Sequence, residues 1–289
     1  MSHTPISIII PAYNEVNAIK PEIERIQQIC VDNQLTSEII VVDDGSTDGT
    51  TEALQGFEGI TIKTHSVNMG YGAALKTGVR ASQYDVICIT DADGTYPNAE
   101  IPGMLKEFEE DNLDMLVGAR TGENVNIPAI RKPAKWVLNQ FANYLTGVNI
   151  PDLNSGLRIM RKSVVERFLN ILPNGFSFTT TITLAMLTNS YSVQYKAIDY
   201  HARTGHSKIR PIHDTLNFVQ LIIRTTMYFH PLKVFLPVGL IFFALSGLLF
   251  LYRVTVHKSF AVTIVILFVT GIQIIALGMI ADMINKRMN

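Results

Sequence analysis

The sequence predicts an α/β protein with a mostly parallel, doubly wound sheet, followed by two membrane-spanning helices. Short apolar runs rich in β-branched residues recur along the first part of the chain, at 6–10, 38–42, 60–64, 86–89 and 114–118. Segments with helical periodicity separate these runs, and this alternation is typical of parallel sheets. Near the end of the 289-residue chain, two uncharged apolar segments each approach or exceed the roughly 20 residues that cross a bilayer.

The composition limits the classes of function. A formal net charge of -1 argues against nucleic acid as the main partner, because proteins that bind it normally carry a basic surface. The two cysteines, Cys30 and Cys88, fall in a predicted helix and a predicted strand, so we expect no disulfide framework and a reducing compartment. Residues 1–5 lack the features of a secretion signal, so we expect the globular part on the cytoplasmic side.

The first predicted elements place several turns at one edge of the sheet. The strand at 6–10 ends in a turn at 11–15, and a helical pattern follows at 16–31. Further helical patterns cover 73–81 and 99–110. Because parallel strands end at the same edge, and open α/β sheets bind ligands there, the turns that follow the strands are candidate binding segments.

The segment at 87–94 is the strongest candidate site. The buried strand at 86–89 runs into Asp91 and Asp93, two carboxylates one residue apart, and Gly94 marks the turn that follows. Alternate residues of an extended chain point the same way, so both carboxylates are able to face one cation. Mg²⁺ is bound by one or two carboxylates together with water and phosphate oxygens. The alternative is that these acids only cap the turn.

Two further turns fit a nucleotide. The acidic, glycine-containing turn at 43–49 suits hydrogen bonds to a base and to ribose hydroxyls. The glycines at 68–72 precede the helix at 73–81, where they allow the backbone to approach a phosphate. Tight packing of the helix on the sheet explains these glycines equally well.

The motifs at 10–15, 41–49, 68–78 and 91–94 together resemble those of family 2 glycosyltransferases. Later segments, at 117–120, 152–158 and 203–208, look like the polyprenyl-phosphate sugar transferases of the dolichol-phosphate mannose synthase group. The resemblance covers nearly the whole chain. It implies a nucleotide-sugar-binding, Rossmann-like domain of the glycosyltransferase A type with a mixed sheet, and transfer with inversion at the anomeric carbon.

The resemblance also implies roles for individual residues. The nucleotide sugar is expected to contact Pro11, Tyr13, Glu15, Val42, Asp44, Ala92, Arg203 and Lys208. Asp91 and Asp93 are expected to hold Mg²⁺ or Mn²⁺ and the diphosphate. Relatives often carry Gln where this chain has Thr95, whose hydroxyl is the third candidate ligand. The Gln-x-x-Arg-Trp motif of processive polysaccharide synthases does not occur in the sequence.

A cluster of cations suits a phosphate acceptor. The residues expected to bind the acceptor phosphate are Arg120, Arg131, Lys135 and Arg203, and Arg120 and Arg131 are also predicted to be catalytic together with Asp91 and Asp93. A phosphate monoester, with a second pKa of about 6, is largely dianionic near neutral pH, so it needs no general base. The alternative, solvated surface charge, is favoured for Lys132 and Arg161. For Asp152 we expect an N-cap or a salt bridge to Arg158.

The last third of the chain predicts a membrane anchor. The two apolar segments at 234–252 and 260–281 are interpreted as spanning helices, and the apolar and basic residues at 211–229 favour a helix that lies at the membrane interface. The predicted domains are a catalytic domain at 1–206, an interfacial region at 207–231 and an anchor at 232–289. Glycines in the anchor favour close helix contacts, within one chain or between the chains of a homo-oligomer.

Two crossings return the C-terminus to the starting side of the membrane. This arrangement puts Lys286 and Arg287 on the cytoplasmic side, as the positive-inside rule prefers, whereas Arg253 and Lys258 in the outer loop weaken that preference. The threonine-rich segment at 175–181 is expected either to start a helix with capping hydroxyls or to line the sugar or acceptor pocket.

The sequence therefore predicts an integral membrane enzyme, of a cell or endoplasmic-reticulum type membrane, with a cytoplasmic catalytic domain. It is expected to use a divalent cation to transfer a hexose or N-acetylhexosamine from a UDP- or GDP-sugar to polyprenyl phosphate. One alternative is a transferase that acts on a glycolipid or glycan hydroxyl. A second alternative is a membrane scaffold that binds nucleotide without turnover. The residues leave open the sugar, the nucleotide, the metal and the length of the polyprenol.

Overall fold

The chain divides into two compact units, Met1–Phe218 and Val219–Asn289. The computed structural model describes residues 4–121, 146–200, 231–256 and 262–288, together with positions 140, 142–144 and 227. The predicted interfacial region at 207–231 lies almost entirely outside these residues.

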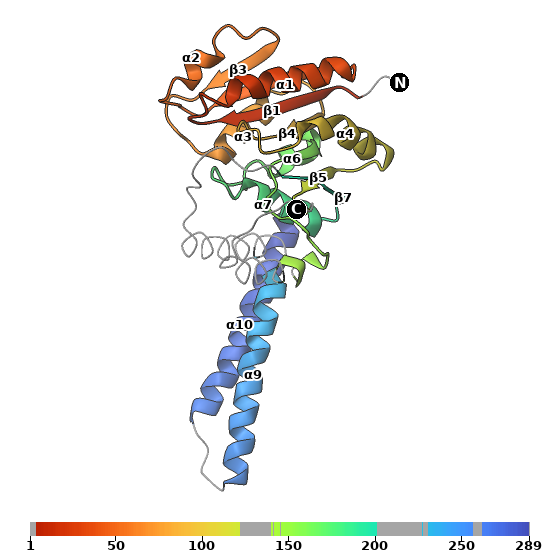
Figure 1. Cartoon of the computed structure of the whole chain (residues 1–289). Coiled ribbons are helices and arrows are strands. Elements are labelled where there is room, and N and C mark those ends of the chain that lie inside the picture. Colours follow the sequence, from red (N-terminus) through yellow and green to blue (C-terminus); the bar gives the residue numbers. More distant parts are fainter. Residues whose placement is uncertain are drawn as a thin grey trace. The chain divides into compact units, whose positions relative to one another are not determined.

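The first unit is built on one sheet of seven strands in the order β3-β2-β1-β4-β6-β5-β7 (Figure 1). The strands are β1 (Ile6–Ala12), β2 (Ser37–Asp43), β3 (Ile60–Thr64), β4 (Val86–Ile89), β5 (Met115–Ala119), β6 (Arg158–Arg161) and β7 (Val193–Ala197). Only β6 runs antiparallel to its neighbours, β4 and β5, among the described strands. The other pairs are parallel, with Ile8 opposite both Ile39 and Cys88. The predicted mixed sheet is confirmed.

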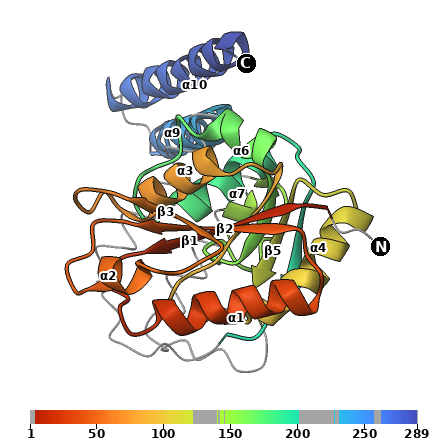
Figure 2. The ribbon, with the colours of Figure 1, turned by 90° about the horizontal axis from the view of Figure 1, so that it is seen from above.

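Helices cover both faces of this sheet. They are α1 (Ile19–Asp32), α2 (Thr50–Leu54), α3 (Tyr71–Ala81), a 3-10 turn η1 (Asn98–Glu100), α4 (Ile101–Glu110), α6 (Lys162–Phe168) and α7 (Phe178–Thr188). Figure 2 shows α1 and α3 on opposite sides of the sheet. The large core lies under α1 and α4, whose isoleucines, leucine and phenylalanine pack on alternate residues of β1, β2 and β4.

The opposite face is packed closely against α3. Ile9 of β1 points to this side, and a side chain at Gly78 of α3 would overlap with it. Ile40, Val42 and Ala74 form a second apolar cluster on the same face. The glycine in α3 therefore lets the helix lie directly on β1.

The second unit is a hairpin of two long helices, α9 (Pro231–Thr255) and α10 (Val262–Met288) (Figure 1). Gly239 and Gly271 lie at the contact, where added side chains would meet Ile275 and Phe243 respectively. Ser246 Oγ donates a hydrogen bond to the carbonyl of Ile264 across the hairpin. Small residues at such contacts let apolar helices approach closely.

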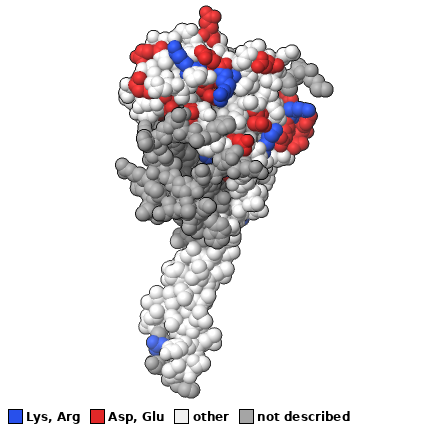
Figure 3. All heavy atoms as spheres, viewed as in Figure 1, with Lys and Arg blue, Asp and Glu red and all other residues white. Residues whose placement is uncertain are grey.

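Both helices are long and apolar enough to span a membrane. Their mean hydropathies are 2.5 and 2.6, and most of their side chains are exposed. On the face of the hairpin that Figure 3 presents, almost all of the surface of the described residues is white and therefore uncharged. An exposed apolar surface of this length is typical of a segment that lies in lipid.

Candidate active site

The Asp91 to Thr95 segment leaves the carboxyl edge of the sheet directly after β4. Thr90 N–H donates to the carbonyl of Ile9, which extends the pairing of β4 with β1 by one residue. The chain then turns at Gly94, where φ is 69°. Asp93 Oδ1 accepts hydrogen bonds from Thr95 N, at 3.1 Å, and from the Thr95 hydroxyl, at 2.6 Å. Thr95 is buried, so in this structure it orients Asp93; its role as a metal ligand stays a prediction.

Asp91 is held by residues from two other parts of the chain. The hydroxyl of Tyr71, the first residue of α3, donates to Asp91 Oδ1 over 2.9 Å. Gly156 lies against the same carboxylate, since a side chain there would begin 3.0 Å from both of its oxygens. Tyr96 OH in turn accepts a hydrogen bond of 2.6 Å from Gly156 N–H. Desolvation and the Asp91 charge raise the pKa of Tyr71 well above its usual value, so the phenol remains a proton donor.

A cavity of about 490 Å³ opens beside Asp93. Its lining includes Glu15, Glu22, Arg25 and Asp48 as well as Asp93 and Gly94. The structure thus brings the predicted Glu15 and Asp93 to one cavity at the carboxyl edge of β1 and β4. Among the residues described, no three His, Cys, Asp or Glu side chains gather as a metal site. A pair of carboxylates is nevertheless the protein's usual share of a magnesium site that is completed by phosphate.

The predicted nucleoside segment at 11–15 interlocks with the acidic turn at 43–49. Asn14, with φ 56°, accepts a hydrogen bond from Thr47 N–H through its side chain. Glu15 N–H donates to Thr50 Oγ1 over 2.9 Å. The predicted contacts Pro11, Val42 and Ala92 are buried, whereas Tyr13 is exposed. The two turns therefore form one surface at the ends of β1 and β2.

Asp44 has a structural partner that the sequence did not reveal. Asp44 is buried, with 2% of the residue exposed. Its carboxylate accepts hydrogen bonds from Met69 N–H at 2.9 Å and Gly70 N–H at 2.7 Å, and it pairs with His65 Nδ1 at 2.6 Å. The other ring nitrogen of His65 lies 2.9 Å from Thr77 Oγ1. In this structure Asp44 fixes the 65–70 loop, and its contact with the nucleoside stays a prediction.

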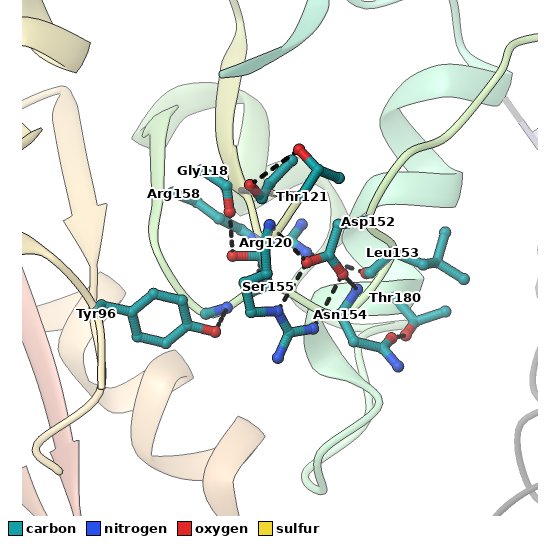
Figure 4. Close-up of polar contacts among 12 residues, drawn as sticks. Tyr96, Gly118, Arg120, Thr121, Asp152, Leu153, Asn154, Ser155, Arg158 and Thr180 are labelled. Carbon is teal, nitrogen blue, oxygen red and sulfur yellow. Dashed lines mark hydrogen bonds and ion pairs between the residues drawn. The ribbon is translucent and has the colours of Figure 1, made fainter. Parts of the chain in front are cut away.

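A second polar cluster joins β5 to the loop before β6 (Figure 4). The Nε and Nη2 groups of Arg120 donate to the two oxygens of Asp152 at 2.7 and 2.9 Å. Burial opposes the ionisation of Asp152, but hydrogen bonds and charge from Arg120 outweigh it and lower the pKa of that carboxyl. The Arg120 guanidinium also lies over the Tyr200 ring, 5.3 Å from its centroid.

Both roles expected for Asp152 are wrong: it lies in the loop before β6 rather than at the start of a helix, and it pairs with Arg120 rather than with Arg158. Arg158 is fully buried, and it donates to the carbonyls of Leu153 and Ser155 in the loop before β6 (Figure 4). It also donates to the carbonyl of Thr179 and to the hydroxyl of Thr183 in α7. These bonds hold the 153–156 loop in place, including Gly156 against Asp91. Arg158 is therefore part of the scaffold of the site.

The loop at 173–176 is docked on the start of α3. Asn174 accepts a hydrogen bond of 3.0 Å from Ala73 N–H, and a side chain at Gly72 would overlap with the Pro173 carbonyl. The docked loop stacks Phe176 on Tyr71, with ring centroids 5.6 Å apart and planes 16° from parallel. The glycine-rich segment at 68–72 thus provides close packing against this loop, rather than against the sheet.

The expectation of capping hydroxyls at 175–181 is wrong, although α7 does begin there. Ser177 occupies the N-cap position without a side-chain bond. The hydroxyls of Thr181 and Thr183 donate back to the carbonyls of Ser177 and Thr179, and Thr180 donates to Asn154. The hydroxyls therefore serve the packing of α7 and of the 153–156 loop.

Several predicted residues lie outside the described part of the chain. They are Arg131, Lys135, Arg203 and Lys208, together with Lys132. Of the predicted acceptor-phosphate cations, the described residues include Arg120 alone. No individual role was predicted for Tyr71, Tyr96, Gly156 or Phe176, although the segments at 68–72, 152–158 and 175–181 were singled out in the sequence. The glycines that flank Tyr71 were the signal that another segment approaches closely there.

A mixed sheet with paired acids at the carboxyl edge of β4 is the fold of a glycosyltransferase of the A type. The profile of glycosyl transferase family 2 matches residues 7–169, more than half of the chain, and the chain belongs to that family. The profile named GtrB C-terminal hairpin matches residues 230–286. The protein is therefore a glycosyltransferase with a helical hairpin that resembles the one in that second family.

Curated relatives match almost from end to end. The dodecaprenyl-phosphate galacturonate synthase of Rhizobium johnstonii is 27% identical, over 97% of this chain and 88% of its own. The undecaprenyl-phosphate 4-deoxy-4-formamido-L-arabinose transferase of Pseudomonas fluorescens is 29% identical, over 97% of this chain and 84% of its own.

Solved structures of lower identity share the fold. Glucosyl-3-phosphoglycerate synthase from Mycobacterium tuberculosis, in complex with Mn²⁺, UDP and phosphoglyceric acid, superposes with a TM-score of 0.60 at 17% identity, over 78% of each chain. Mannosyl-3-phosphoglycerate synthase from Rubrobacter xylanophilus gives a TM-score of 0.58 at 20% identity, over 77% of this chain and 72% of its own.

Proposed function

We propose that the protein transfers a hexose or N-acetylhexosamine from a UDP- or GDP-sugar to the phosphate of a membrane-bound polyprenyl phosphate. The observation that carries the proposal is the match, over 97% of this chain, to two relatives whose names specify sugar transfer to a polyprenyl phosphate. The paired acids and the apolar hairpin support it, because they suit a nucleotide diphosphate and a lipid respectively.

Asp91 and Asp93 would hold the divalent cation, Mg²⁺ or Mn²⁺, together with the diphosphate of the donor. The residues present fit a divalent cation, since two carboxylates lie one residue apart and Asp93 lines a cavity large enough to admit a ligand. A structural neighbour was solved with Mn²⁺ and UDP. When bound, the cation offsets the negative charge that grows on the departing nucleoside diphosphate.

The chain's own residues prepare this site before the donor binds. Tyr71 and Gly156 fix the Asp91 carboxylate, and Thr95 fixes Asp93. The nucleoside is proposed to lie on the surface formed by the turns at 11–15 and 43–49. Because these groups are held by hydrogen bonds, little ordering remains to be done when substrate binds.

The acceptor is proposed to need cations rather than a base. Near neutral pH its phosphate is largely dianionic and already nucleophilic, so no proton has to be removed as it attacks the anomeric carbon. Asp152 holds the Arg120 guanidinium in one orientation, from which it is able to attract this dianion, with Arg131, Lys135 and Arg203 proposed as its companions. Attack in line with the departing diphosphate inverts the anomeric configuration.

The apolar hairpin supports a proposal for the membrane arrangement. We propose that α9 and α10 cross the bilayer, that the catalytic unit lies on the cytoplasmic side where nucleotide sugars occur, and that residues 207–231 rest at the interface. Gly247 has open space around it within the hairpin, which leaves room for a helix of a second chain in a homo-oligomer.

A donor and acceptor screen tests the proposal. Membranes containing the full chain are incubated with labelled UDP- and GDP-sugars, and either polyprenyl phosphate or the phosphate-free polyprenol is added. We expect an acid-labile glycosylated lipid with the phosphate acceptor and none with polyprenol. A glycan polymer, or a glycoside of polyprenol, would overturn the proposal in favour of a hydroxyl acceptor. An absence of transfer from every donor would favour the scaffold alternative.

A further inference from the structure

A chain of buried polar side chains links the two ends of the loop that carries Asp91 and Asp93. Thr90, the residue before Asp91, donates through its hydroxyl to Asn98 Oδ1 over 2.7 Å. Asn98 in turn donates through Nδ2 to Glu22 Oε1. The three residues are 0%, 1% and 4% exposed, respectively. Buried polar groups are costly unless they are paired, so a fully connected chain of this kind fixes the segments that it joins.

The segments joined are the halves of the proposed donor site. The bond between Thr90 and Asn98 closes the loop that contains Asp91 and Asp93. Glu22 belongs to the first turn of α1, which begins at Ile19, shortly after the proposed nucleoside segment at 11–15. Glu22 also lines the same cavity as Asp93. The polar chain therefore connects the acidic loop to the nucleoside side of the cavity.

The second carboxylate oxygen of Glu22 lies against the middle of the loop that carries Asp91 and Asp93. A side chain built on Gly94 would begin 3.3 Å from Glu22 Oε2, so this oxygen lies close against the turn between Asp93 and Thr95. Burial raises the pKa of Glu22, and the hydrogen bond from Asn98 opposes that rise. Burial of a carboxylate is unfavourable unless the group is paired, so Glu22 has a structural role that a solvated residue on the helix surface would not have.

We infer that Glu22, Asn98 and Thr90 are positioning residues. They hold the loop that carries Asp91 and Asp93 in the geometry required to bind the cation together with the nucleoside diphosphate. The inference rests on the proposed role of Asp91 and Asp93. It assigns to the three residues no contact with substrate. The inference predicts that the affinity for the cation falls when the chain of hydrogen bonds is cut, and that the affinity is kept by a substitution that preserves these bonds.

The test measures Mn²⁺ binding by the full-length protein in detergent micelles, with UDP or GDP present, by electron paramagnetic resonance. Thr90→Val and Glu22→Leu keep the volume of the side chains but cut the chain of bonds, and we expect each to weaken Mn²⁺ binding about 3- to 10-fold. Glu22→Gln keeps an oxygen that accepts the Asn98 bond, so its affinity should stay within about twofold of wild type. Both substitutions interrupt the same chain of hydrogen bonds. The double variant should therefore bind Mn²⁺ only slightly less tightly than the single variant with the lower affinity.

Thr188→Val is the matched control. The Thr188 hydroxyl donates to the Leu184 carbonyl within α7. The substitution is the same threonine-to-valine change as at Thr90, but it removes a hydroxyl that lies outside the chain of bonds. We expect wild-type affinity from this variant. If Glu22→Leu does not fold, the nearly isosteric Thr90→Val decides.

Unchanged Mn²⁺ affinity in Thr90→Val and Glu22→Leu would overturn this inference and would leave the proposed function standing. An equal loss in Thr188→Val would also overturn it, since the effect would then be a general response to substitution. If the wild-type protein bound no Mn²⁺ with either nucleotide, the metal role of Asp91 and Asp93 would fail, and the inference with it.

Discussion

The Tyr71 hydroxyl donates a hydrogen bond of 2.9 Å to Asp91 Oδ1, which ties the first residue of α3 to the first acid of the pair after β4. Phe176 lies on the Tyr71 ring and limits its movement. The loop that carries Phe176 is itself held by the backbone of α3. The orientation of one acid at the sheet edge thus depends on a segment more than 80 residues further along the chain.

Replacing Tyr71 by Phe should lower kcat/KM for sugar transfer about tenfold. The substitution removes one hydrogen bond to a charged group, worth about 1.5–3 kcal/mol, while it keeps the ring stacked on Phe176. The same bond stabilises the folded state, so the thermal midpoint should fall by about 3–12 °C, while the circular dichroism spectrum at 25 °C stays that of the wild type. Steady-state kinetics and circular dichroism measure the two effects.

Tyr191→Phe is the control for that experiment. The Tyr191 hydroxyl accepts a hydrogen bond from Arg167 at 3.0 Å, and it lies outside the proposed site. The same chemical change should leave kcat/KM unaltered there. Equal activity in both variants would show that the Tyr71 hydroxyl does not matter for Asp91.

Gly72→Ala should destabilise the catalytic unit. A methyl group at this position overlaps with the Pro173 carbonyl, so the 173–176 loop has to move away from α3. Overpacking of this kind costs about 1–3 kcal/mol, or roughly 2–10 °C in the thermal midpoint. The paired control is Gly175→Ala, which meets nothing within 4 Å and should leave the midpoint unchanged. A stable Gly72→Ala variant would contradict the docking of this loop.

Asp152→Asn should change how stability depends on pH. Because the folded pKa of Asp152 lies below its usual value of 3.8, ionised Asp152 stabilises the fold at neutral pH, and this contribution disappears as the pH falls below 3.8 through the folded value. Near pH 7 the variant should unfold about 6–12 °C earlier, since breaking a buried pair costs about 3 kcal/mol. The difference between variant and wild type should shrink towards pH 3. A difference that stays constant over this range would argue against the ionic pairing with Arg120.

The hairpin offers a matched pair of glycine substitutions. Gly271→Leu introduces a side chain where Phe243 lies within 2.8 Å of the first added atom, so we expect weaker pairing of α9 with α10 and a lower thermal midpoint. Gly247→Leu enters open space within one chain and should leave the hairpin intact. If Gly247→Leu alters the mass of the detergent-solubilised protein in light scattering while Gly271→Leu does not, Gly247 lies in a contact between chains.

The sequence predicted the elements with uniform local character. Runs that are buried on both faces, such as β1 and β4, are apolar except for Ser7 and appear at the expected positions. The strands β6 and β7 were not predicted, because β6 begins and ends with arginine and β7 is partly exposed. Neither has a local pattern that separates it from a polar loop.

The partners of the site residues depend on strand order, which local sequence does not encode. Asp152 is six residues from Arg158 and 32 from Arg120, yet it pairs with Arg120 because β5 lies beside β6 in the sheet. Arg158 is buried because carbonyls from the 153–156 loop and from α7 converge on it. The acids themselves could be predicted, since a short buried strand that ends in two carboxylates is visible in the sequence alone.

The most direct test of the account is the cation dependence of sugar transfer to polyprenyl phosphate. Full-length protein is stripped with EDTA and titrated with Mn²⁺ or Mg²⁺, next to Asp93→Asn, and the linkage of the lipid product is determined by mass spectrometry. We expect no transfer without a cation, saturable recovery when it is added, a sugar joined to the lipid phosphate, and a rate at least about 100-fold lower in Asp93→Asn. Undiminished transfer in EDTA or in the variant, or a sugar joined to a hydroxyl, would contradict the account.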